Sequence, residues 1–146
     1  MLIGALCAAT ALGAGATRAQ TPAQDIILIR QAGMALQQGV IDAMVAAVKS
    51  GADVKTFKGG ADAIGFWAEQ IPLMFPPGSE KGHDTRAKPE IWSDFAGFTK
   101  DAKALADAAG PLKQAAEAGD GAAFASQLKT VGDACVACHR SYRQRR

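Results

Sequence analysis

The chain has 146 residues, of which 49% are hydrophobic and 21% are charged. This apolar content is enough to build one packed domain, so disorder is not expected over most of the chain. The formal net charge of +2 is too close to balance for a protein that binds nucleic acid through a basic face. Aromatic residues make up only 6% and alanine is abundant, so the composition favours α-helices over β-sheet.

Residues 1–19 resemble a secretory signal peptide, because they are small and apolar and end in the sequence Gly-Ala-Thr-Arg-Ala. Ala19 stands at the expected cleavage site, although no Lys or Arg precedes the apolar stretch. This stretch is shorter than the ~20 residues needed to span a bilayer, so we expect export rather than a membrane anchor. The mature domain is then residues 20–146, without a membrane span, and it lies in an oxidising compartment.

Four segments after the signal carry apolar residues at helical spacing. They are residues 22–50, 54–71, 91–116 and 124–142. Gly59-Gly60 weakens the first half of the second segment, Pro72 ends that segment, and Gly110-Pro111 predicts a kink or a short break in the third. Residues 75–89 form the longest connection. The chain is therefore predicted to be all-α, an antiparallel up-down-up-down four-helix bundle.

Residues 135–139 have the sequence Cys-Val-Ala-Cys-His, the C-x-x-C-H pattern to which haem is covalently attached in c-type cytochromes. On a helix, Cys135 and Cys138 are one turn apart on one face, so both thiols can reach the two vinyl groups of one porphyrin. His139 then presents its imidazole to the iron. The third cysteine, Cys7, lies within the predicted signal. The pattern predicts one haem c and its iron as the cofactor.

Three other uses of this pattern fit the sequence less well. A thioredoxin-like dithiol would place C-x-x-C at a helix start within a βαβ pattern, whereas these cysteines lie near the end of the last helix. A zinc site would need a fourth ligand, and His83 is the only other histidine. A structural disulfide between cysteines three apart would constrain little and would leave His139 unexplained. Haem attachment is the favoured interpretation.

Position in the sequence does not decide which residue is the second axial ligand of the iron. In such a bundle the haem motif shares one end with the start of the first helix and with the long connection. Met34, Met74 and His83 are then within reach of the iron, whereas Met44 is displaced by about 15 Å along the helix axis. Met34 is equally well explained as an ordinary core methionine.

The chain resembles the class II cytochromes c, which comprise the cytochromes c' and their low-spin relatives. The resemblance rests on C-x-x-C-H on the last of four helices, on residues 89–94 (Pro-Glu-Ile-Trp-Ser-Asp) opening the third, and on Arg30-Gln31 in the first. It covers essentially the whole mature chain. It implies a four-helix bundle that is exported to the bacterial periplasm and is commonly a homodimer.

The same resemblance implies roles for individual residues. Cys135 and Cys138 hold the haem, His139 is the proximal iron ligand, and Met34 faces the distal side. The residues implied to surround the haem are Arg30 and Gln31 beside the propionates, Arg143 beside His139, and Ser79 and Glu80 in a loop at the haem edge.

Two functions follow from the family, which divides at the position of Met34. If Met34 binds the iron, the protein is an electron carrier that serves a redox partner protein. If Met34 does not bind, the distal site is open to nitric oxide (NO) or carbon monoxide (CO). We expect no conventional enzyme activity. The arginines from Arg140 to Arg146 complement the dipole at the end of the last helix or form a docking patch for an acidic partner.

Overall fold

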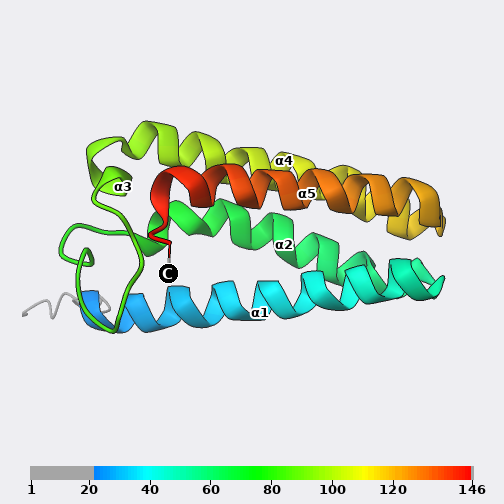
Figure 1. Cartoon of the computed structure of the whole chain (residues 1–146), viewed down its shortest axis with the longest axis horizontal. Coiled ribbons are helices and arrows are strands. Elements are labelled where there is room, and N and C mark those ends of the chain that lie inside the picture. Colours follow the sequence, from blue (N-terminus) through cyan, green and yellow to red (C-terminus); the bar gives the residue numbers. More distant parts are fainter. Residues whose placement is uncertain (1–21, 146) are drawn as a thin grey trace, which may run out of the picture.

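The computed structural model describes residues 22–145 and is built from helices (Figure 1). The predicted signal peptide and Cys7 lie outside the described residues. The elements are α1 (Ala23–Ser50), η1 (Val54–Phe57), α2 (Lys58–Gln70), η2 (Ile71–Met74), α3 (Glu90–Ser93), α4 (Phe95–Ala118) and α5 (Gly121–Tyr142), where η denotes a 3₁₀ helix. Between residues 22 and 145, no helix is both long and apolar enough to cross a membrane.

The predicted antiparallel four-helix bundle is confirmed. Helices α1, α2, α4 and α5 run alternately up and down along a common axis (Figure 1). The start of α1, the end of α2, the starts of α3 and α4 and the end of α5 lie at the same end of the bundle (Figure 1). The cysteine and histidine motif near the end of α5 is therefore close to the long connection and to the first turns of α1.

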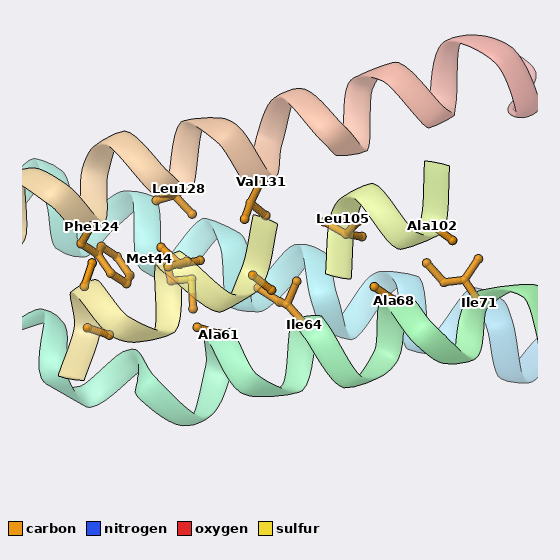
Figure 2. Packing of buried hydrophobic residues seen from close by; sticks show 14 of the residues in the cluster. Met44, Ala61, Ile64, Ala68, Ile71, Ala102, Leu105, Phe124, Leu128 and Val131 are labelled. Carbon is orange, nitrogen blue, oxygen red and sulfur yellow. The ribbon is translucent and has the colours of Figure 1, made fainter. Parts of the chain in front are cut away.

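The core is formed mainly by the apolar faces of α2, α4 and α5, to which α1 adds Met44 (Figure 2). Phe124 at the start of α5 is fully buried, and its ring lies 6.1 Å from that of Phe57. Burial of such a side chain stabilises the fold by about 1.5–3 kcal/mol relative to leaving it exposed. Spacings of three and four residues place Ala61, Ile64 and Ala68 on one face of α2, which explains why the sequence pattern located these helices.

The second predicted segment is divided into three parts. Residues 54–57 form η1, whose N-cap Asp53 accepts a hydrogen bond from the backbone N–H of Lys55. Helix α2 starts only at Lys58, although it contains the Gly59-Gly60 pair. Helix α2 ends at Gln70. The chain continues as the 3₁₀ helix η2, which contains Pro72.

The third predicted segment is interrupted at Asp94. At Gly110-Pro111, where the sequence predicts a kink or a short break, the helix has no break. The backbone of Asp94 is not helical (φ −127°, ψ 55°). Asp94 is the N-cap of α4, and its side chain accepts a hydrogen bond from the backbone N–H of Gly97. Helix α4 is continuous through Pro111, which is exposed. A proline costs a helix interior about 3 kcal/mol, and the packing of the apolar face of α4 on both sides of Pro111 outweighs this cost.

Candidate haem-binding site

The last turns of α5 carry the cysteine and histidine motif. The helix begins at the N-cap Asp120, which accepts a hydrogen bond from Ala123 N–H at 2.9 Å, and its buried face continues from Phe124 to Tyr142. Cys135 and Cys138 are half-buried free thiols that pack against the core. The two thiols thus share the inner face of one helix, as the sequence predicts.

Burial is the largest cause of a raised pKa in both thiols. It raises the pKa of Cys135, and it raises that of Cys138 to about 12, with a further contribution from the charge of Asp101. Both groups are therefore protonated near neutral pH. Thiols that act in disulfide exchange have lowered pKa values, so these two do not have the electrostatic environment of a redox dithiol.

His139 follows Cys138 and is exposed on α5. Partial desolvation is the largest cause that lowers the pKa of His139, followed by the positive charges of Arg143 and Arg86. The imidazole is thereby favoured in its neutral form, which is the form that binds metal ions. Arg143 also donates its backbone N–H to the carbonyl of His139 at 3.1 Å, so these two residues are neighbours at the end of α5.

Arg30 is buried on α1 and is bound by the long connection. Its Nη1 donates to Met74 O at 3.1 Å and to Ser79 Oγ at 2.9 Å. Its Nη2 donates to Ser79 O at 2.7 Å and to Thr85 Oγ1 at 3.0 Å. The guanidinium also lies 4.2 Å from the centre of the Phe75 ring. Burial lowers the pKa of Arg30 to about 10, while the charge of Glu80 acts in the opposite direction.

Two other predicted site residues, Ser79 and Glu80, lie in the same connection, and Gln31 on α1 is hydrogen-bonded to it. Ser79 is fully buried and donates its hydroxyl to Pro76 O at 2.8 Å. Glu80 accepts a hydrogen bond from Gly78 N–H at 3.0 Å, and this bond is the largest cause of its lowered pKa. Gln31 donates to the carbonyl of His83 at 2.8 Å. The structure therefore gathers Arg30, Gln31, Ser79 and Glu80 at one place.

The possible second iron ligands differ in their surroundings. Met34 is half-buried on α1 and packs against the core, and Met74 is half-buried at the end of η2. His83 is exposed, in a left-handed backbone conformation (φ 45°). Helix α1 also packs against α5, so the helix that bears Met34 faces the helix that bears His139.

The long connection is also fastened to the end of α5, which the sequence analysis did not foresee. Lys88 donates to the carbonyls of Arg140 and Ser141, and Ala87 forms an antiparallel bridge with Arg143. Lys88 binds backbone carbonyls, which every residue has, so a pattern of side chains in the sequence cannot predict these bonds. Residues 74–89 thus link α1 to the end of α5 beside the motif.

A second feature that the sequence analysis missed is the contact of Trp67 with Gly33. The indole of Trp67 on α2 lies so close to α1 that a Cβ at residue 33 would overlap the ring. Its Nε1 is buried and has no hydrogen-bond partner among residues 22–145. A buried donor without an acceptor is uncommon in native proteins. Together with two thiols and an imidazole on one helix, this orphaned donor fits a site that is completed by a prosthetic group.

A sequence model of the family described as Cytochrome C' matches residues 25–143. The chain belongs to the cytochrome c' family. Cytochrome c' of Rhodospirillum rubrum is 41% identical over 83 residues, which are 57% of this chain and 56% of that protein. The chain thus aligns with little more than half the length of this relative. Cytochrome c-556 of Agrobacterium tumefaciens is 36% identical over 118 residues, covering 78% of this chain and 93% of the relative.

Solved structures of the family have the same fold. Cytochrome c' from Thermochromatium tepidum superposes with a TM-score of 0.81 at 30% identity, covering 87% of this chain and all of that chain. A nitric oxide complex of a cytochrome c' variant from Alcaligenes xylosoxidans superposes with a TM-score of 0.76 at 32% identity, covering 85% of this chain and 97% of that one. The resemblance inferred from the motifs is confirmed, and the chain has the four-helix-bundle fold of the cytochromes c'.

Proposed function

We propose that this cytochrome is a periplasmic electron carrier with one haem, attached through thioether bonds to Cys135 and Cys138. The observation that carries this proposal is the pair of half-buried thiols one turn apart on α5, followed at once by His139. Export depends on the signal at residues 1–19, which is removed. The iron of haem c supplies a one-electron couple between its ferrous and ferric states.

The iron is ligated by His139 and Met34 in this proposal. Met34 is supported by its half-buried position on α1, the helix that packs against α5. The lowered pKa of His139 keeps its imidazole available as a ligand near neutral pH. A thioether ligand favours the ferrous state, so the reduction potential is higher than that of a site with His139 alone. Electrons pass to a redox partner protein of the periplasm.

The surrounding residues position the ligands. Arg30 and Ser79 hold the connection 74–89 against α1, and the same connection is bound to the end of α5. This arrangement fixes the helix of Met34 relative to the helix of His139. Arg30 and Gln31 lie beside the haem propionates in the proposal, and Arg143 lies beside His139. The protein assembles as a homodimer, as family members commonly do.

A second function is the binding of NO or CO at a five-coordinate iron. The nitric oxide complex of the Alcaligenes xylosoxidans protein, which has the same fold, favours this alternative. In that case Met34 is an uncoordinated apolar neighbour of the open site.

Substitution of the two methionines tests the proposal in the purified holoprotein. Met34→Ala is expected to convert a six-coordinate low-spin optical spectrum into a five-coordinate high-spin one. Met74→Ala, which removes the other half-buried thioether, is expected to leave the spectrum unchanged and serves as the control. If the wild-type spectrum is already high-spin, the gas-binding alternative replaces the electron carrier. If only Met74→Ala changes a low-spin spectrum, Met74 is the ligand.

A further inference from the structure

Trp67 carries a hydrogen-bond donor without a partner in the described part of the chain. Its Nε1 is buried and finds no acceptor among residues 22–145. Leaving a buried donor unpaired costs about 1–3 kcal/mol. The other tryptophan, Trp92, differs in this respect, because its Nε1 donates to Pro76 O at 3.3 Å. Within residues 22–145 the surroundings of Trp67 therefore offer no acceptor, and a bound molecule can supply one.

The position of Trp67 indicates where that acceptor lies. The indole extends from α2 to the backbone of α1 at Gly33, the residue before Met34. Gly33 is itself buried, and a side chain there would overlap the ring. The donor is thus held between α1 and α2, at the part of α1 that bears the proposed iron ligand.

Arg30, one turn before Gly33 on α1, places a buried positive charge at the same part of the helix, which favours an anionic acceptor. It is buried, yet all four of its hydrogen bonds are to neutral oxygens of Met74, Ser79 and Thr85. No ion pair within residues 22–145 includes Arg30. Glu80 acts on Arg30 through its charge but forms no ion pair with it among these residues, so the guanidinium would also stabilise a further carboxylate that accepts the N–H of Trp67.

We propose that the indole N–H of Trp67 donates a hydrogen bond to a propionate carboxylate of the haem. The porphyrin nitrogens are occupied by the iron, so the propionates are the strong acceptors that haem c offers. Gly33 permits the bond because its missing side chain lets the indole approach α1. The inference rests on haem attachment in the proposed function, but not on ligation by Met34.

The hydrogen bond can be observed directly in the holoprotein. Trp92→Phe leaves Trp67 as the only tryptophan, since the sequence contains two. Ultraviolet resonance Raman spectra of this variant report whether the indole N–H is bonded. We expect a bonded N–H. An unbonded N–H overturns the inference. If the haem is attached in the same sample, haem attachment in the proposed function stands although the inference has failed.

A second measurement identifies the acceptor. Trp67→Phe keeps an aromatic ring but removes the N–H, so the propionate charge is less well stabilised, the ferric state is favoured and the reduction potential falls. Trp92→Phe is the matched control and should leave the potential unchanged. Gly33→Ala, which displaces the indole, should lower the potential as Trp67→Phe does. An unchanged potential in Trp67→Phe overturns the inference, and a simultaneous loss of NO affinity would assign the donor to an iron-bound gas instead.

Discussion

The phenol of Tyr142 donates a hydrogen bond to Oδ2 of Asp94 at 2.8 Å. The other carboxylate oxygen of Asp94 accepts the N–H of Gly97 at 3.1 Å and caps α4. The ring of Tyr142 also packs edge-on against Phe98, with ring centres 5.3 Å apart. One aspartate therefore joins the last residue of α5, just after the haem motif, to the first turn of α4.

This relationship predicts the titration of Tyr142. Burial is the largest cause that raises its pKa to about 12, and the hydrogen bond to Asp94 is the second. Asp94→Asn should lower this pKa without bringing it to the ordinary value of 10.0, because the burial remains. Tyr142 is the only tyrosine, so ultraviolet absorbance of tyrosinate measures it alone. Asp107→Asn, which alters an exposed carboxylate paired with Lys103, is the control. An unchanged titration in Asp94→Asn would contradict the assignment.

Replacement of Arg30 by Lys should destabilise the fold. A lysine ammonium cannot reproduce the planar arrangement by which the two Nη atoms bind the connection 74–85. We expect the free energy of unfolding in urea to fall by about 2 kcal/mol, since buried bonds to a charged group are lost. Lys129→Ala breaks an exposed pair with Asp133 and should cost less than about 0.5 kcal/mol. Equal stability of Arg30→Lys and wild type would show that Arg30 does not hold the connection.

The lowered pKa of Glu80 predicts that the stability of the fold depends on pH in the acidic range. Its pKa lies below the ordinary value of 4.5, chiefly because the carboxylate accepts the N–H of Gly78. The contribution of Glu80 to stability is thus fully present above about pH 4.5 and is lost as the pH falls through the lower pKa of the folded state. In Glu80→Gln the free energy of unfolding should vary less with pH in this window. Identical pH profiles for the two proteins would contradict this role.

The sequence predicted the bundle because each long helix has one apolar face, and such a pattern depends on spacing alone. Its errors in the third segment have physical causes. The helix breaks at Asp94 because this aspartate is an N-cap, whose side chain accepts the N–H of Gly97 three residues later. No break occurs at Pro111, because the face of α4 on both sides of this proline is packed in the core. The local sequence does not show whether packing will hold a helix together across a proline.

The site could be predicted only in part. Cys135, Cys138 and His139 form a contiguous motif, so they were found at once. The partners of Arg30 lie 44 to 55 residues away along the chain and include backbone carbonyls, which have no signature in the sequence. The contact between Gly33 and Trp67 is similarly invisible, because a glycine within a helix does not reveal which side chain takes the space that it leaves.

The most direct test of the central claim is an optical spectrum of the purified, reduced holoprotein, recorded with and without carbon monoxide. A haem iron bound by both His139 and Met34 gives a sharp low-spin spectrum that carbon monoxide does not change, and this is the result that we predict. A high-spin spectrum that shifts when the gas is added would contradict ligation by Met34 and electron transfer as the proposed function.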